Sequence, residues 1–401
     1  MPAPSLSRYA LIPAAIFLFI LPFTQTVALR LFCLTIAFVT TLYYAYRGPR
    51  PSLPLKLPLL FWAGISFLSV AWSIEPNYSA GEFKNEVGYT LLAFLSFFYL
   101  TRSESDWRFW RLALTLSTVV ISLFAFYYYA HYGTWITTGR VGDRNAYSTY
   151  VVLIMPFLLL AATQSQGITR IFVWVSILLA LTSGYLTLNR NMWITLTIEF
   201  VIFGSLYLRK SSLPGRKRTL GVLVIVALCA LLSALFVSTS YVKSGQALSS
   251  EALNQYTEQD PRVQIWLYVK ERITQRPLTG YGFGRGILRK EFREHFNNIL
   301  YWHAHNMLLN YALEAGIFGM AALLGLFVAM AWTFWKLYRS KCSDAWSLGI
   351  FGLTLLAGLA MKSATDDILI RDNALLFWSL VGMALGLGQR LISQTEELHT
   401  A

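Results

Sequence analysis

Apolar segments of nearly membrane-spanning length recur along most of this chain of 401 residues. A helix that crosses a bilayer needs about 20 largely apolar residues, and about twelve segments come close to that length. They are 9–28, 31–46, 57–73, 87–101, 111–130, 146–163, 170–188, 191–208, 219–240, 314–337, 346–362 and 373–388. Because backbone polar groups in lipid must be satisfied within their own element, this pattern predicts an all-α integral membrane protein.

The low content of charged residues excludes a soluble globular protein. Charged residues make up 13% of the sequence and hydrophobic residues 56%, whereas about a quarter of the residues of a soluble domain are charged. The formal net charge is +13, but the basic residues stand between apolar segments rather than on one face. This distribution does not indicate nucleic-acid binding. The cysteines have no paired spacing and no Cys/His pattern that would indicate a disulfide framework or a metal site.

Lysine and arginine are distributed unevenly between the two sets of connecting segments. If the N-terminus is cytoplasmic, the short cytoplasmic segments are the richer set, with the densest cluster at 209–218. This asymmetry follows the positive-inside rule and predicts a multi-pass protein of a bacterial inner membrane, with a retained first span and both termini cytoplasmic. We expect nine transmembrane helices over 1–240, a long periplasmic loop with an amphipathic helix over 241–303, and three further helices with a cytoplasmic tail over 304–401.

Polar residues near the helix ends gather on the predicted periplasmic side. They form four clusters, namely 139–145 with Arg144, 189–191 with Arg190, His303 with His305, and Asp366 with Asp367 and Arg371. Ionisable residues at the edge of a membrane are costly, and they usually face a bundle interior or a water-filled cavity. We therefore expect the functional site on this face.

Two of these features allow more than one interpretation. Arg190 lies between two apolar segments, and it either reaches the lipid headgroups as an anchor or binds an anion. The long loop has glycines at 280, 282, 284 and 286, which either let a phosphate approach the backbone or form a tight turn. They are not a dinucleotide-binding fingerprint, because Arg285 stands where the last glycine would fall.

His303 and His305 stand directly before a predicted helix. A neutral imidazole can accept a proton from a sugar hydroxyl; alternatively, both rings bind lipid headgroups. A metal site is disfavoured because no third ligand has suitable spacing, and Asp366 and Asp367 would have to fold across. Without a metal, arginine is the group best suited to stabilise a departing pyrophosphate. This chemistry favours an activated, lipid-linked sugar as the substrate.

Four short motifs follow one another between residues 262 and 319. They are Arg262-x-x-x-Trp266, Pro277-x-x-Gly280-x-Gly282, His305-Asn306-x-x-Leu309 and Glu314-x-Gly316-x-x-Gly319. In this order and spacing, the chain resembles the superfamily of O-antigen ligases and polymerases. The resemblance implies a GT-C-type membrane glycosyltransferase, without metal or cofactor, that uses glycans linked to undecaprenyl pyrophosphate in the periplasm. In the ligase branch, the acceptor is lipid A–core oligosaccharide.

The resemblance also implies roles for individual residues. The essential histidine of the family maps onto His305. Residues expected to bind the donor pyrophosphate are Arg190 and Arg262, with Arg144, Arg285 and Arg289 as further candidates. Residues expected to support them are His303, Asn306, Glu314 and Asp367, although His303 is not part of the matched pattern.

The loop lengths favour the ligase branch. Polymerases are usually described with two sizeable basic periplasmic loops, whereas this chain has one long loop and a short one at 131–145. We therefore expect an O-antigen ligase, with a polymerase that lengthens the lipid-linked glycan as the alternative. A transporter or flippase is less favoured, because the sequence has no two-half symmetry and its charged groups cluster at one face rather than at mid-depth.

Overall fold

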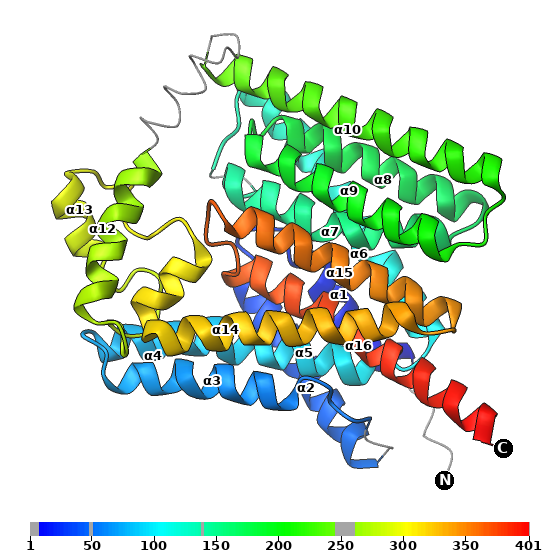
Figure 1. The fold of residues 1–401 in the computed structure, drawn as a ribbon, viewed down its shortest axis with the longest axis horizontal. Coiled ribbons are helices and arrows are strands. Elements are labelled where there is room, and N and C mark those ends of the chain that lie inside the picture. The colour runs from blue at the N-terminus through cyan, green and yellow to red at the C-terminus, as the bar shows by residue number, and fades with distance from the viewer. Residues whose placement is uncertain (1–7, 48–50, 138–139, 245–260, 401) are drawn as a thin grey trace.

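Helices make up most of the chain in the computed structural model, which describes residues 8–47, 51–137, 140–244 and 261–400 (Figure 1). The first part contains η1 (Arg8–Leu11), α1 (Ile12–Ile20), α2 (Val27–Arg47), α3 (Lys56–Ala71), α4 (Pro76–Phe83), η2 (Lys84–Gly88) and α5 (Tyr89–Leu100). The middle part contains α6 (Glu104–Tyr132), α7 (Arg144–Gln164), α8 (Gly167–Tyr185), α9 (Arg190–Lys210) and α10 (Gly215–Ser244). The last part contains α12 (Pro261–Gln275), α13 (Arg289–Phe296), α14 (Met307–Arg339), α15 (Ser343–Ser363) and α16 (Arg371–Thr400).

Nine helices among the described residues are long and apolar enough to cross a membrane. They are α2, α6, α7, α8, α9, α10, α14, α15 and α16, and the segments Arg8–Ile20 and Lys56–Ala71 are shorter apolar helices. Each segment expected to span the membrane overlaps a helix, but α1 and α5, with 9 and 12 residues, are short for a complete crossing. The chain is an all-helical, integral membrane protein.

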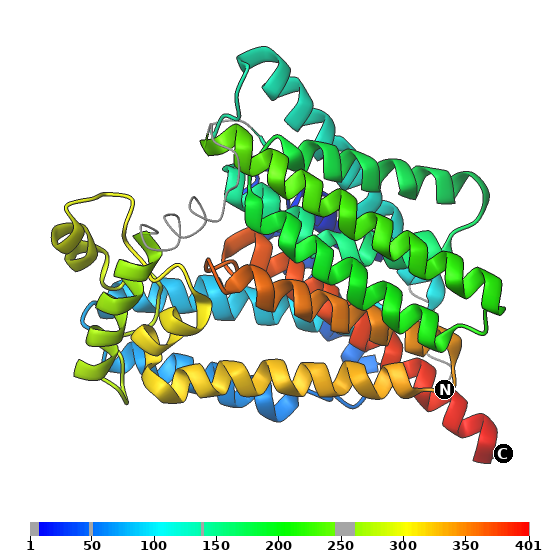
Figure 2. The same ribbon diagram turned by 45° about the horizontal axis from the view of Figure 1, so that its top comes forward.

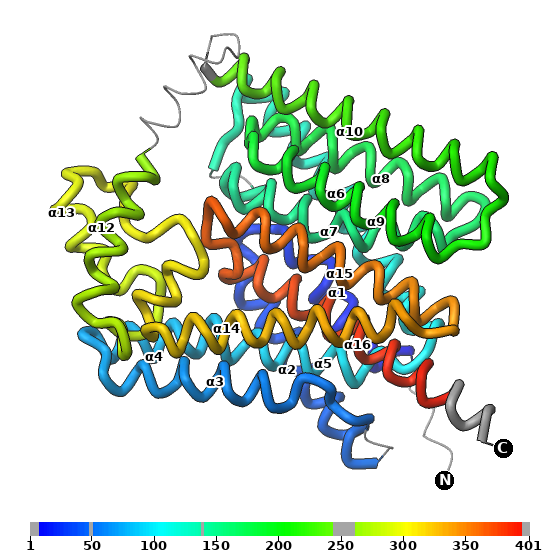
Figure 3. The backbone as a smooth tube through the Cα atoms, viewed as in Figure 1, coloured from blue at the N-terminus to red at the C-terminus, as the bar shows by residue number. Residues whose placement is uncertain are grey.

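The axes of the long helices are roughly aligned, so that the helix ends gather at two faces of the bundle (Figure 3). α7 is the central helix, because 89% of its apolar window is buried, compared with 6% for α10. α10 lies along the edge of the bundle (Figure 1). An apolar helix that remains so exposed requires a lipid environment.

α12 and α13 lie together at one end of the bundle, beside the start of α14, in both views (Figures 1 and 2). α12 occupies the segment for which the sequence predicts an amphipathic helix. Its buried residues pack with Tyr281, Phe292 and Leu313 in a small hydrophobic core of their own. Residues 245–260 of the expected long loop, and Gly139 of the short one, lie outside the described residues.

α14 is interrupted at Ala315 and Gly316, where the backbone leaves the helical conformation. Leu313, just before the break, accepts a hydrogen bond from the backbone N–H of Tyr281 at 2.7 Å, and just after it the N–H of Ile317 donates to Pro277 at 2.8 Å. The glycine-containing loop that precedes α13 is therefore docked onto the break in α14.

Gly280 shows why this loop needs glycine. Its φ of +65° lies in the left-handed region, and an added Cβ would stand 2.5 Å from the carbonyl oxygen of Leu313. A side chain would therefore push the loop away from α14. The regularly spaced glycines, which could have served a turn or a phosphate, support close packing of one backbone on another at this position.

Replacing Gly280 with alanine should destabilise the protein by about 1–3 kcal/mol, because the new Cβ meets backbone and the φ is unfavourable. Gly325→Ala is the matched control, since it lies within α14 and an added Cβ would meet no atom within 4 Å. Thermal unfolding in detergent should show a lower midpoint for Gly280→Ala alone. Equal midpoints would contradict the packing role of Gly280.

Candidate active site at one end of the bundle

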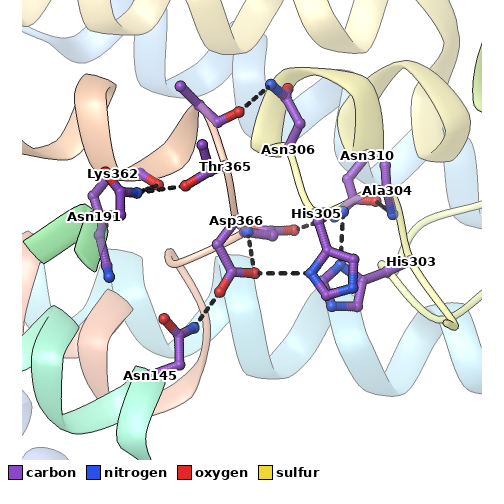
Figure 4. A network of polar contacts seen from close by, with 12 residues as sticks. Asn145, Asn191, His303, Ala304, His305, Asn306, Asn310, Lys362, Thr365 and Asp366 are labelled. Atoms are coloured by element: carbon purple, nitrogen blue, oxygen red, sulfur yellow. Dashed lines mark hydrogen bonds and ion pairs between the residues drawn. The ribbon is translucent and has the colours of Figure 1, made fainter. Parts of the chain in front are cut away.

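His305 and Asp366 form the centre of a polar network at the end of the bundle (Figure 4). His305 precedes α14 and has a φ of +48°, an uncommon conformation for a residue other than glycine. Its Nδ1 lies 3.6 Å from Oδ1 of Asp366, which belongs to the turn between α15 and α16. The other carboxylate oxygen, Oδ2, accepts a hydrogen bond from the amide of Asn145 at the start of α7. Three segments far apart in the sequence thus meet at one carboxylate.

The Asp366 carboxyl remains charged in this position. Burial alone would raise its pKa, but hydrogen bonding with His305 and the nearby His303 outweigh burial and hold the pKa below its ordinary value. The backbone N–H of Asp367 also donates to Oδ1 at 2.8 Å. An anionic Asp366 can orient the ring of His305 and stabilise a positive charge that forms on it.

His303 is buried behind His305, with the two ring centroids 3.9 Å apart. Its Nδ1 accepts a hydrogen bond of 3.1 Å from the backbone N–H of His305, and this bond supports the unusual backbone conformation at His305. Burial, followed by the charges of His305 and Arg285, lowers the pKa of His303 to about 3. His303 is therefore a neutral hydrogen-bond acceptor that shapes the site.

A second set of hydrogen bonds fixes the segment between the two histidines. The backbone N–H of Ala304 donates to Oδ1 of Asn310 at 2.8 Å, and the Asn310 amide donates to Asp367 at 2.7 Å. Burial raises the pKa of the Asp367 carboxyl, with the charge of Arg285 acting against this effect. The two adjacent aspartates thus have different partners. Asp366 faces the ring of His305, whereas Asp367 accepts from Asn310, which in turn binds the backbone of Ala304.

The turn after α15 is held from two sides. Asn191 of α9 donates to the hydroxyl of Thr365, and Asn306 donates to the carbonyl of Ala364 at 3.1 Å (Figure 4). The buried ammonium of Lys362 donates to the hydroxyl of Ser148 at 3.3 Å. The position of Asp366 therefore depends on helices α7, α9 and α14 together.

Three helices that meet here begin with an asparagine or aspartate cap. Asp143 accepts from the backbone N–H of Ala146 in α7 at 2.8 Å, Asn189 from Met192 in α9 at 3.3 Å, and Asn306 from the first turn of α14 at 3.1 Å. Asn189 also donates to the side chain of Asn145 at 3.3 Å, which links the starts of α7 and α9. Helix N-termini carry partial positive charge and favour anions.

The arginines expected to bind pyrophosphate fall into two groups. The first group is Arg144, Arg190 and Arg262. All three lie close enough to Lys243, at the end of α10, for their positive charges to affect it. The second group consists of Arg285 and Arg289, each with its guanidinium 4.6 Å from the ring centroid of Trp302. We call this second group the Trp302 stack. The Trp302 ring also meets His303 edge-on, with centroids 4.3 Å apart.

One cavity is lined by the His305–Asp366 pair, and a second lies near it. A polar cavity of about 390 Å³ is lined by Asn145, Arg285, Trp302, His303, His305 and Asp366, among others. An apolar cavity of about 460 Å³ lies between α14 and α15 and begins at Asn306 and Ala364. Asn145 and Asn306 lie on opposite sides of the His305–Asp366 pair (Figure 4), so the two cavities approach it from different directions.

The candidate residues from the sequence are only partly brought together. His303, His305, Asn306 and Asp367 are neighbours, whereas Glu314 is buried at the break in α14, where its carboxyl accepts from the backbone of Gly284. The sequence reasoning missed Asp366 as the partner of His305, and it also missed Asn310, Lys362 and Trp302. Signals were present for two of them, because Asp366 adjoins Asp367 and Lys362 interrupts an apolar segment.

His303, His305 and Asp366 could also hold a metal ion, because one ligand atom from each lies within 4.8 Å of the other two. The argument from spacing against a third ligand was wrong, since the turn after α15 does fold across to the histidines. Two features are unfavourable for coordination. Nδ1 of His303 is occupied by the backbone N–H of His305, and the two imidazole rings lie over one another at 3.9 Å.

The pKa of His303 predicts how stability depends on pH. A free imidazole has a pKa of about 6.5, whereas that of buried His303 is about 3. Between these values the unfolded chain binds a proton that the folded chain does not, so stability falls as the pH drops below about 6.5. His303→Asn keeps an acceptor for the backbone, and its unfolding midpoint should fall less than that of the wild type between about pH 7 and about pH 5.

The matched control is His131→Asn, at an exposed position near the end of α6. An equal fall in midpoint for His303→Asn and the wild type would show that His303 takes up no proton on unfolding.

Comparison with known proteins identifies a family match over part of the chain. Residues 175–324 match the family model described as O-antigen ligase. The matched segment contains α9, α10, α12, α13 and the first half of α14, and with them Arg190, Arg262 and His305. No curated protein matches the chain. The family recognised from the motifs is confirmed, and the chain is a membrane protein that contains an O-antigen ligase family domain.

Proposed function

We propose that the protein is an O-antigen ligase of the bacterial inner membrane, which transfers a glycan from undecaprenyl pyrophosphate to lipid A–core oligosaccharide on the periplasmic side. The observation that carries the proposal is His305 paired with an anionic Asp366 at the edge of the polar cavity. Arg190 and Arg262 belong to the first cationic group, which gathers around Lys243, and Arg262 also lies near Lys362. This arrangement supplies a base and an anion site, which are the two groups that glycosyl transfer from a pyrophosphate requires.

In the proposed reaction, a hydroxyl of the acceptor sugar attacks the anomeric carbon of the donor. His305 faces Asp366 through Nδ1, which leaves Nε2 to accept the hydroxyl proton. The new bond joins the acceptor oxygen to the anomeric carbon, the bond from that carbon to the pyrophosphate oxygen breaks, and the configuration is inverted. Asp366 stabilises the imidazolium that forms, in the way that a carboxylate does beside a histidine base.

The first cationic group would bind the departing pyrophosphate. Arg144 and Arg190 begin α7 and α9, so the helix N-termini add to the positive potential there. Arginine is suited to this role because its planar fork can form two hydrogen bonds with one phosphate. Lys362, buried below Asp366, adds a further positive charge that lies near Arg262.

The apolar cavity supports a lipid-linked donor. Met307 and Leu308 line it together with Leu324 and Phe327, which lie on the other side of the break in α14. On α15 the lining extends from Leu353 to Ala364, which is about 16 Å of helix. An apolar space of this length that opens beside Asn306 suits the first part of a polyprenyl chain whose pyrophosphate lies at the arginines.

The central test is transfer by purified protein from an undecaprenyl-pyrophosphate-linked glycan to rough lipopolysaccharide. His305→Ala should lower kcat by about 10²–10⁴ because the general base is lost. Asp366→Asn should lower it by about 10–100-fold because the ring loses its charged partner. Asp344→Asn, on the exposed first turn of α15, is the matched control. Full activity of His305→Ala would exclude the proposed mechanism.

The same assay separates the alternatives. Lengthening of the lipid-linked glycan without any acceptor would identify a polymerase, and movement of the donor across a vesicle membrane without transfer would identify a flippase. EDTA should leave transfer unchanged. Loss of activity that an added divalent metal restores would instead assign His303, His305 and Asp366 to a metal.

Arg190→Lys tests whether the first cationic group binds pyrophosphate through its fork. The variant keeps the charge but loses bidentate bonding, so kcat/KM for the donor should fall at least about tenfold. Arg209→Lys, in the last turn of the same helix, is the matched control. Equal turnover by Arg190→Lys and the wild type would favour the anchoring role for Arg190.

A further inference from the structure

The Trp302 stack forms part of the wall of the polar cavity. Both Arg285 and Trp302 line the cavity, whereas Arg144, Arg190 and Arg262 do not. Trp302 contacts His303 edge-on, so the stack lies next to the histidine pair. Arg285 therefore lies where a molecule in the polar cavity would meet it, and Arg289 adjoins the cavity through the same Trp302 ring. Both are separate from the group proposed for the donor pyrophosphate.

The two arginines of the stack retain hydrogen-bonding capacity. Among the described residues, no carboxylate oxygen lies within 4 Å of Arg285 or Arg289. Each guanidinium lies over the face of Trp302. Arg285 is half-buried and Arg289 is exposed. The charge of Arg285 acts on Asp367 and Glu314, but no ion pair with a described residue restrains its N–H donors. Stacking on an aromatic ring holds a guanidinium in place while its edge stays available for an anion.

The rest of the lining resembles a site for a carbohydrate. Asp143, Asn145, Asp372 and Asn373 supply polar groups that can bind hydroxyls, and Tyr147 adds an aromatic ring. Sugar rings bind through hydroxyls that form hydrogen bonds and through C–H faces that pack on aromatic side chains. The cavity reaches His305, which places a bound hydroxyl beside the proposed base.

We propose that the polar cavity binds the acceptor sugar, and that the Trp302 stack recognises an anionic substituent, a phosphate or a carboxylate, on that sugar or its neighbour. The inference rests on the proposed function and goes beyond it by naming a feature that the acceptor must carry. It also assigns Arg285 and Arg289 to the acceptor, whereas the sequence grouped them with the donor arginines. Arginine forks bind phosphate and carboxylate alike. The stack therefore indicates that the acceptor carries a negative group, and the experiment decides whether that group is a phosphate or a carboxylate.

The experiment uses full-length protein, the undecaprenyl-pyrophosphate-linked glycan as donor, and three forms of rough lipopolysaccharide. One form is intact, one is dephosphorylated and one has its carboxylates reduced. The variants are Arg289→Gln and Trp302→Leu. The matched control is Arg276→Gln, because Arg276 also stacks on an aromatic ring, that of Tyr281 at 5.0 Å. Tyr281 does not line the polar cavity, whereas Trp302, the ring beneath Arg289, does. KM is measured separately for donor and acceptor, and binding of labelled lipopolysaccharide is measured without donor.

We expect the wild type to lose affinity for one of the two modified acceptors, which identifies the anionic group. Arg289→Gln should raise the acceptor KM by about tenfold on intact lipopolysaccharide, the cost of a lost charged hydrogen bond, and should leave the donor KM unchanged. On the acceptor without the anionic group, Arg289→Gln and the wild type should be alike. Arg276→Gln should match the wild type throughout.

Two outcomes would overturn the inference. The first is that Arg289→Gln raises the donor KM instead, which would return the stack to the pyrophosphate. The second is that the wild type binds and uses all three acceptors equally. Failure of the proposed function looks different, because the wild type would then transfer to none of the acceptors. The binding measurement would still decide whether the stack recognises an anion on lipopolysaccharide.

Discussion

The carboxylate of Asp366 is held in place by groups from several helices, and the rest of the site depends on this one position. Asn145 of α7 and the ring of His305 contact it directly, while Asn191 and Asn306 hold the turn that carries it. A buried charge is costly unless it is paired and hydrogen-bonded. The same interactions that meet this cost also bring α7, α9, α14 and α15 together at one end of the bundle.

The break in α14 also helps to place His305 opposite Asp366. At Gly316 the helix leaves its path, and the glycine-containing loop docks on the backbone carbonyls of Leu313 and Glu314. The short first part of α14 then carries His305 and Asn306 toward the turn after α15. The motif residues around Gly280 and Gly316 are therefore one structural unit that positions His305, although they lie more than 30 residues apart in the sequence.

Much of the fold follows from the sequence because lipid imposes a simple rule on spanning segments. The helices fall where apolar runs occur, and His305 and Arg190 stand out because ionisable groups at the edge of a membrane are costly. Arg262 is identified only through the resemblance to the family. The pairing of His305 with Asp366 could not be predicted, because it depends on tertiary packing across 60 intervening positions. Likewise, only the packed structure separates Arg285 and Arg289 from the other arginines, because their stacking on Trp302 cannot be predicted from their positions in the sequence.

The balance of charge around His305 explains why the site contains both arginines and aspartates. A base that takes up a proton becomes a cation, and two groups of arginines nearby would oppose that step. Asp366 offsets this repulsion at the ring itself, while the low pKa of His303 keeps a second imidazole neutral directly behind it. In the proposed reaction, the arginines can then act on the anions of the donor and the acceptor at either side without preventing proton transfer at His305. Under the proposed function, the site joins two anionic, lipid-anchored molecules and needs this separation, because a single undivided cationic cluster would bind both anions and suppress the base.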